Sequence, residues 1–346
     1  MGQATSQGAA VRVHPASLIA ADVGGTHARV ALLAAGPRGG DDFAILEYRK
    51  YACADFASLA EIIGDFRAAS AGAAIDRVAL AIAGFVIDDA VVNVNLPWPV
   101  SISTLRRTLG VRELALVNDF EAIAHAIGHV DAGSATLLCG PQQATLPGPI
   151  LVVGPGTGLG AALRIAHAGH PVILGTEAGQ ATLAPETDLE FDLLREMRRH
   201  ARVDIEHVLS GPGLVNLHRA LGALRGAAAT SRTPAEITSA AFSRTDALAR
   251  ETVEVFCGWL GAVLGDLALV YGAQGGIYLA GGVLPQMKEL LVASTFVARF
   301  LDKGAMRQAL GQTPVRLVEH AQLGVIGAAS WYFSNHPRDA REGARA

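Results

Sequence analysis

Lysine is scarce in this 346-residue sequence, which has only Lys50, Lys288 and Lys303. None of them stands in a Gly-Lys-Ser/Thr triplet, so the sequence excludes a P-loop nucleotide site. Charged residues of both signs make up only 17% of the chain, and the net charge is −4. A nucleic-acid-binding protein needs a basic patch, and because no long basic run occurs we expect no nucleic-acid partner.

Cysteine is also rare. Cys53, Cys139 and Cys257 are odd in number and far apart, and no Cys-x-x-Cys pair occurs. This pattern argues against a disulfide framework and a cysteine zinc site. The N-terminus lacks a charged segment followed by an apolar core, so we predict no secretory signal and a cytoplasmic protein.

Two further classes are disfavoured by hydropathy. Hydrophobic residues make up 51% of the chain, which excludes intrinsic disorder. The uncharged stretch 267–287 is interrupted by five glycines and a proline. A membrane-spanning helix needs about 20 predominantly apolar residues in one run. We therefore predict the end of a buried helix, a glycine turn and a buried strand here, and no membrane partner.

Glycine is abundant, at 39 residues, above the usual ~7%. Apolar runs and helical periodicities alternate along the chain, which predicts an α/β fold. Two Thr-x-x-Glu capping boxes, at 187–190 and 233–236, mark helix starts. The predicted strands are 18–23, 29–33, 43–51, 78–83, 114–117, 150–153, 163–165, 172–174, 277–280 and 315–318, and the predicted helices are 56–69, 120–127, 187–200, one from 233, 246–271 and 323–332.

The length predicts about two domains, and the Pro/Gly-rich segment 140–149 is the candidate join. The sequence also contains an internal echo. The glycine turn Asp22–Thr26 lies between two predicted strands, and so does the turn Gly154–Gly160. A duplicated fold with one glycine hairpin in each half would produce this pattern.

The first turn, at Asp22, Val23, Gly24, Gly25 and Thr26, combines a carboxylate, glycines and a hydroxyl after a buried strand. Glycines allow backbone N–H groups to converge on an anion. Asp22 could hold Mg²⁺ through water, because Mg²⁺ keeps much of its hydration shell. The alternative is a plain hairpin whose glycines supply positive φ.

The second turn has four glycines in seven residues, including Gly154, Gly156 and Gly158, with Thr157 among them. A strand follows rather than a helix, so a Rossmann motif is disfavoured and an anion-binding loop is favoured. Gly281 and Gly282 follow another predicted strand, where the absence of side chains would let a flat group such as a nucleobase approach. A strand-to-helix turn is the alternative.

Asn118 and Asp119 end a predicted strand and begin a helix. Open α/β sheets bind ligands at this edge, and a carboxylate there could accept a proton from a substrate hydroxyl. Alternatively, Asp119 is only a helix cap. Glu177 and Glu206 lie in predicted turns, where carboxylates can bind sugar hydroxyls or form part of a solvated surface.

Five motifs together resemble the bacterial glucokinase family, the hexokinase-like group outside the ROK branch. These motifs are ADVGGTHARVAL, LALVNDFEAIA, VVGPGTGLGAA, EHVLSGPGLVNL and YLAGGVLP, and the resemblance extends over 18–331. It implies a two-domain actin-like ATPase (ribonuclease H-like) fold with a cleft between the domains. The implied boundaries are 16–130 plus 322–335 for the small domain and 131–321 for the large one, with flexible tails at 1–15 and 336–346.

The resemblance also implies roles for the candidate residues. Asp119 would be the catalytic base for phosphorylation of glucose at the 6-hydroxyl. Asn118, Asp119, Glu177, Gln180 and Glu206 would bind the sugar. The turns at 22–26 and 154–158 and the pair Gly281–Gly282 would bind ATP, with Mg²⁺ near Asp22, in a cytoplasmic homodimer.

Two positions depart from the family pattern. Gln180 replaces a family histidine, and His27 replaces an asparagine. Glutamine can donate and accept hydrogen bonds but carries no charge, so the preferred sugar stays open. The alternatives are a kinase for another hexose, or a non-catalytic sugar sensor of the same fold.

Overall fold

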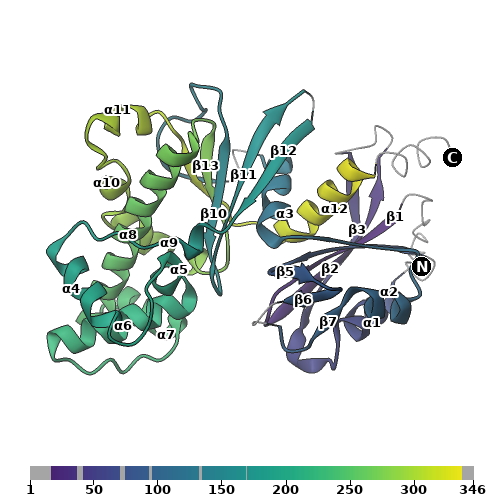
Figure 1. The fold of residues 1–346 in the computed structure, drawn as a ribbon, viewed down its shortest axis with the longest axis horizontal. Helices are drawn as coiled ribbons and strands as arrows, with labels where there is room; N and C mark the ends of the chain where they lie inside the picture. The colour runs from purple at the N-terminus through teal and green to yellow at the C-terminus, as the bar shows by residue number, and fades with distance from the viewer. Residues whose placement is uncertain are drawn as a thin grey trace, which may run out of the picture. The chain divides into compact units, whose positions relative to one another are not determined.

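A computed structural model describes residues 17–36, 42–70, 75–92, 96–131, 135–168 and 170–336. The predicted tails at 1–15 and 336–346 lie outside these ranges apart from His336. The chain forms two compact units (Figure 1). The first unit contains the described residues up to His129 and those from Gln322 onward, and the second is Val130–Ala321.

A five-stranded sheet is the centre of the first unit. Its strands in spatial order are β3 (Phe43–Ala52), β2 (His27–Ala35), β1 (Ser17–Val23), β4 (Arg77–Ile82) and β8 (Glu113–Val117). β3, β2 and β1 are antiparallel neighbours, whereas β1, β4 and β8 run parallel. A second, small antiparallel sheet contains β5 (Phe85–Ile87), β6 (Ala90–Val92) and β7 (Val100–Ser101).

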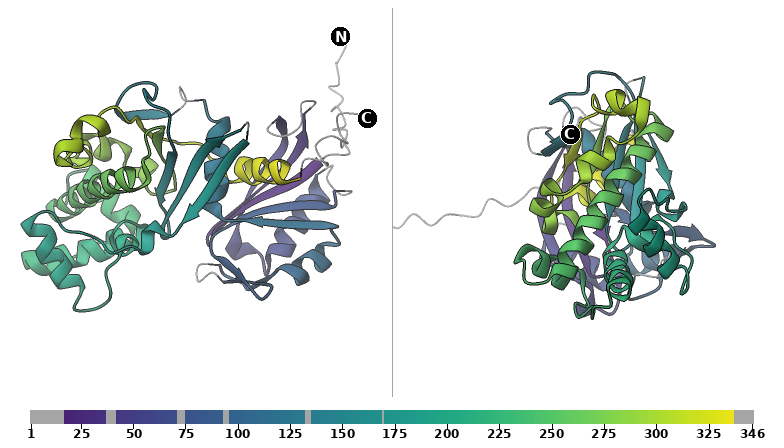
Figure 2. Two further views of the ribbon diagram at one scale, coloured as in Figure 1. Left: turned by 45° about the horizontal axis from the view of Figure 1, so that its top comes forward. Right: turned by 90° about the vertical axis from the view of Figure 1, so that its left-hand side faces the viewer.

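Successive side chains of a strand point to opposite faces of its sheet. In the large sheet apolar side chains point to both faces, and both faces are buried. On β1, Ile19 and Ala21 belong to a core that includes residues of α1 (Leu59–Ala69) and α2 (Ile102–Leu109). Leu18 and Ala20 belong to a separate core on the other face. Helices α3 (Asp119–Ala126) and α12 (Leu323–Asn335) complete that face, and Figure 2 shows α12 in yellow along the sheet.

The second unit repeats this arrangement. Its sheet has the order β12 (His170–Thr176), β11 (Leu159–His167), β10 (Ile150–Pro155), β13 (Gly276–Leu279), β14 (Val315–Leu317) and β9 (Thr136–Cys139). β12, β11 and β10 are antiparallel neighbours, and β10, β13 and β14 run parallel. The first five strands of this sheet thus follow the order and directions of the sheet in the first unit, with a glycine hairpin between the first two strands along the chain, and β9 is an added antiparallel edge strand. This agrees with the duplication predicted from the sequence.

Helices supply most of the core of the second unit. They are α4 (Asp188–Met197), α5 (Ile205–Val208), α6 (Gly211–Arg225), α7 (Pro234–Phe242), α8 (Ala247–Tyr271), α9 (Lys288–Ala293), α10 (Phe296–Phe300) and α11 (Arg307–Leu310). Both predicted capping boxes are present, at the starts of α4 and α7.

Helix α8 is the one described helix long and apolar enough to cross a membrane. Of its most apolar 18-residue window, 72% is buried, and the Trp259 indole nitrogen donates a hydrogen bond to the Ala184 carbonyl at 3.0 Å. The helix ends at Tyr271 and is followed by β13, as predicted from the glycine-interrupted stretch. α8 is thus a central core helix of the second unit.

The predicted domain join at 140–149 is wrong. β9 precedes this segment and β10 follows it, and both strands belong to the sheet of the second unit. The Pro/Gly-rich composition therefore marks a loop within one unit. The change of unit occurs earlier, between His129 and Val130.

A buried polar pair links α6 and α8. His218 is fully buried, and its Nδ1 lies 2.9 Å from the Thr252 hydroxyl. That hydroxyl donates to the Leu248 carbonyl at 2.7 Å, so it accepts a hydrogen bond from Nδ1–H. The Nε2 atom is buried without a hydrogen-bond partner. Burial lowers the pKa of His218, while Asp246 opposes this shift.

We predict that His218 lowers the stability of the folded protein at acidic pH. Because its folded-state pKa is lowered, the unfolded chain binds the proton first as pH falls below about 6.5, and stability falls with it. His218→Asn should reduce this acid-side loss. The measurement is the thermal unfolding midpoint of both proteins at pH 7.5 and 5.5. An equal decrease in both would show that other groups cause the pH dependence.

Candidate active site

The predicted site residues are distributed over both units. Asp22–Thr26, Asn118 and Asp119 lie in the first unit, and the remaining candidates lie in the second. Within the first unit, Asp22 pairs with Ala81 of β4, and Ala81 pairs with Val117 of β8. The carboxyl ends of these parallel strands therefore form one edge of the sheet. This edge carries both Asp22 and the Asn118–Asp119 pair.

The first glycine turn is a tight β1–β2 hairpin. The Gly24 N–H donates to the His27 carbonyl at 3.0 Å. Cys53 supports the turn, because its N–H donates to the Thr26 carbonyl at 2.9 Å and its thiol donates to the Gly24 carbonyl at 3.3 Å. Sequence reasoning missed this role of Cys53, because no local sequence pattern indicates a contact between two residues about thirty positions apart in the chain.

Two residues lie against the Asp22 carboxylate, Arg29 on β2 and Gly324 on α12. Arg29 on β2 donates to its Oδ2 at 3.1 Å. Burial raises the pKa of Asp22, and the Arg29 charge partly opposes that rise. On helix α12, a Cβ on Gly324 would lie 2.3 Å from the Asp22 Cγ, so the glycine leaves space for this carboxylate.

His27 adds no positive charge to the first turn at neutral pH. Burial lowers the pKa of its imidazole, and the nearby Lys50 and Arg29 cations lower it further. The ring is therefore neutral near pH 7, as the family asparagine would be. The departure at this position changes shape rather than charge.

At the start of α3, the neighbouring residues Asn118 and Asp119 have different roles. Asn118 is the N-cap, and its Oδ1 accepts hydrogen bonds from the N–H groups of Phe120 at 2.9 Å and Glu121 at 3.3 Å. Asp119 is the first residue of the helix, and its Oδ1 also accepts from the Phe120 N–H at 3.0 Å. The capping role considered for Asp119 thus belongs to Asn118.

The backbone of the second glycine loop is hydrogen-bonded to the start of helix α6. The Gly156 N–H donates to the Gly158 carbonyl, and the Gly211 N–H at the start of α6 donates to the Gly156 carbonyl, each at 2.8 Å. At Gly156 an added Cβ would meet no atom within 4 Å. At Gly158 it would lie 2.5 Å from Oε2 of Glu206. The two glycines therefore have different neighbours.

Gly281 lies directly against this loop. It has a φ of +97°, and an added Cβ would lie 2.8 Å from the Pro155 carbonyl oxygen. Gly282 has no such neighbour within 4 Å. Three of the glycines predicted to bind the nucleotide, Gly154, Gly156 and Gly281, are thereby gathered at one edge of the second sheet.

Glu206 and Gln180 form a close pair beside the same loop. The Gln180 amide donates to Oε1 of Glu206 at 2.6 Å, and the Leu159 N–H donates to Oε2 at 3.2 Å. Burial raises the pKa of Glu177, and the Glu206 charge raises it further. The structure thus brings three of the predicted sugar-binding side chains together, and Glu206 also contacts the end of the glycine loop.

Among the described residues, no group of three or more His, Cys, Asp or Glu side chains could hold a metal ion. Proteins commonly bind Mg²⁺ through one or two carboxylates together with substrate phosphates. An Mg²⁺ ion that arrives with a nucleotide needs no cluster of protein ligands. Asp22 stays the candidate predicted from the sequence, and it forms an ion pair with Arg29.

The fold is shared with glucokinases and ROK sugar kinases, which have the actin-like ATPase fold. The solved glucokinase from an Antarctic psychrotroph is 37% identical, with a TM-score of 0.78 over 92% of this chain and 99% of that one. A ROK family glucokinase from Streptomyces griseus, solved with glucose and AMPPNP, shares the fold at 21% identity and a TM-score of 0.60, covering 91% of this chain and 98% of its own.

The glucokinase family model matches residues 19–335. A glucokinase-like protein of Xylella fastidiosa (strain 9a5c) is 50% identical over 320 residues, which are 92% of this chain and 95% of the relative. The chain belongs to the glucokinase family. The family resemblance read from the five sequence motifs is confirmed.

We expect Gly156 to lie against a nucleotide phosphate. Gly156→Ala adds a methyl group that no described atom of the protein opposes. It should leave thermal stability unchanged but raise the Kd for ATP at least about tenfold, a loss of about 1.4 kcal/mol. Calorimetric titration with an unreactive ATP analogue measures this, and an unchanged affinity would remove Gly156 from the nucleotide site.

Gly158→Ala is the matched comparison. Its methyl group would contact Glu206, so it should weaken hexose binding as well as nucleotide binding. Because of the Glu206 contact, Gly158 is a less specific probe than Gly156.

Proposed function

We propose that the protein is an ATP-dependent glucokinase that transfers the γ-phosphoryl group of ATP to the 6-hydroxyl of glucose. The observation that carries the proposal is the contact between Glu206 and the second glycine loop. Glu206 accepts hydrogen bonds from Gln180 and from Leu159, the residue that follows Gly158. A candidate sugar-binding carboxylate is thus joined directly to a candidate phosphate loop within one unit.

The proposed mechanism rests mainly on positioning. Phosphoryl transfer passes through a loose transition state with little covalent work for the protein. Asp119 accepts the proton of the 6-hydroxyl, and Asn118, Glu177, Gln180 and Glu206 orient the sugar. The glycine turns at 22–26 and 154–158, with Gly281–Gly282, hold MgATP. Closure of two domains over a cleft between them would exclude water and limit ATP hydrolysis.

The identity of the hexose is the part of the proposal that most needs a test. Steady-state assays with ATP, Mg²⁺ and a panel of glucose, mannose and glucosamine should give the highest kcat/KM for glucose. A higher value for another hexose would identify a different hexokinase. Tight sugar binding without phosphoryl transfer would identify a sugar sensor. The presence of Asp22, Asp119 and both glycine loops favours the enzyme.

Gln180 is expected to tune sugar affinity. Its uncharged amide donates a hydrogen bond to the Glu206 carboxylate. A protonated imidazole at this position would donate a charge-assisted bond to a sugar hydroxyl, roughly twice as strong as the neutral bond that an amide donates to that hydroxyl. Gln180→His should therefore lower the KM for glucose several-fold, on the order of 1 kcal/mol, and change kcat less. An unchanged or higher KM would mean that glutamine is an equal substitute or serves another sugar.

The remaining parts of the proposal follow from the family resemblance. We infer a homodimer in the cytoplasm that acts on glucose and ATP, without a nucleic-acid or membrane partner. Sedimentation velocity at micromolar concentration tests the dimer. A monomer at all concentrations would contradict it.

A further inference from the structure

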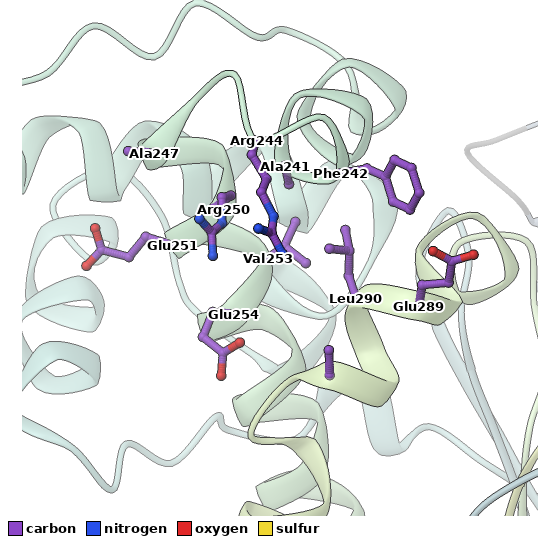
Figure 3. A pocket seen from close by; sticks show the side chains of 11 residues that line it. Ala241, Phe242, Arg244, Ala247, Arg250, Glu251, Val253, Glu254, Glu289 and Leu290 are labelled. Atoms are coloured by element: carbon purple, nitrogen blue, oxygen red, sulfur yellow. The ribbon is translucent and has the colours of Figure 1, made fainter.

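A hollow in the second unit includes none of the predicted substrate residues. The end of α7, the start of α8 and helix α9 form its walls, and its volume is about 680 Å³ (Figure 3). This size is within the range of about 300–1,000 Å³ that ligand pockets occupy. Apolar side chains line it, including Val253 and Leu290, together with charged residues.

The charges in this hollow are arranged asymmetrically. Figure 3 shows the guanidinium groups of Arg244 and Arg250 turned toward its centre, whereas the Glu251 and Glu254 carboxylates point away. A third lining carboxylate, Glu289 of α9, lies on the side of the hollow near Phe242, apart from the two arginines. Glu251 forms an ion pair with Arg225 at 2.5 Å, and Glu254 accepts a hydrogen bond from the Thr295 N–H at 2.9 Å. These two carboxylates are therefore engaged elsewhere, and the arginines face the hollow.

Arg244 occupies a position where its backbone is unfavourable. It follows the C-cap of α7 and has a φ of +56°, in the left-handed region. Glycine is the usual residue there, because a side chain adds strain. Strained residues are concentrated at functional sites, where another role retains the side chain. An arginine at this position is consistent with a guanidinium group needed in the hollow.

The rim adds a flat apolar surface. Phe242 lines the hollow and is 60% exposed, and it comes from the last turn of α7. Two guanidinium groups recognise a phosphate through paired hydrogen bonds. An exposed aromatic ring can stack on a flat group of the ligand.

We propose that this hollow binds an organic phosphate that carries a flat apolar group. The phosphate contacts Arg244 and Arg250, and the flat group lies against Phe242. The proposal does not depend on which hexose the enzyme phosphorylates.

The test uses phenyl phosphate as the probe and calorimetry on the full chain. Wild type should bind it, and Arg244→Gln and Arg250→Gln should each weaken binding at least tenfold. Arg307→Gln, which changes an exposed arginine of α11 away from the hollow, should leave the affinity unchanged. Phe242→Ala should also weaken binding, and inorganic phosphate should bind less tightly than phenyl phosphate.

Three outcomes would overturn the proposal. They are no binding at millimolar probe, equal affinity in wild type and both arginine variants, or equal loss in all three arginine variants. Equal affinity for phosphate and phenyl phosphate would reject the flat-group part. Both arginines are exposed, so Gln is expected to preserve folding, and thermal unfolding checks this independently.

Discussion

Asp119→Asn should lower kcat by about 100-fold or more, the usual scale for the loss of a general base. Asparagine keeps the shape of the side chain but cannot accept the hydroxyl proton. The fold should be unaffected because Asn118, not Asp119, caps α3 through the N–H groups of Phe120 and Glu121. Steady-state kinetics with saturating glucose and ATP measure the change.

Glu121→Gln is the matched control for this experiment. Glu121 lies in the same first turn of α3, and burial raises its pKa. The same carboxylate-to-amide change there should leave kcat within about twofold, because no role in proton transfer is proposed for it. If Asp119→Asn kept a near-normal kcat, Asp119 would not be the base.

Gly327→Ala should destabilise the protein by about 3 kcal/mol, at the upper end of the usual cost of overpacking. Helices α3 and α12 pack so closely here that an added Cβ would lie 1.8 Å from the Ala122 carbonyl oxygen and 2.3 Å from its carbon. Both of these atoms belong to the backbone, so no side-chain rotation relieves the contact. Thermal or urea unfolding measures the loss.

Gly64→Ala provides the opposite result with the same chemical change. Gly64 lies inside α1, and an added Cβ there would meet nothing within 4 Å. Alanine should stabilise that helix by roughly 0.5–1 kcal/mol. If Gly327→Ala and Gly64→Ala had the same free energy of unfolding, the close approach of α3 and α12 would not matter for stability.

The sequence predicted those parts of the fold that local sequence patterns, such as glycine turns and capping boxes, indicate. The two glycine turns between strands indicated a duplicated topology, and both sheets have it. Helix starts followed the capping boxes at Thr187 and Thr233. The first predicted helix began three residues early, at Phe56, because Ser58 is the N-cap that starts α1.

The candidate site was predictable only in part, for a physical reason. Local motifs identify residue types but not the distant neighbours that fix their geometry. Cys53 behind the first turn and Gly324 against Asp22 are contacts between segments far apart in the chain. The error at 140–149 has the same origin, since composition reveals a loop but not which sheet lies on either side.

The placement of α12 has a consequence for how the chain folds during its synthesis. The second unit is one continuous segment, whereas the first needs both the N-terminal residues and those after Gln322. One face of the first sheet includes Leu18 and Leu33, and its core is completed by Val325 and Phe333 of α12. Until the ribosome releases those last residues, this apolar face has no helix α12 to cover it. The N-terminal unit, translated first, is therefore the one that must wait to finish folding.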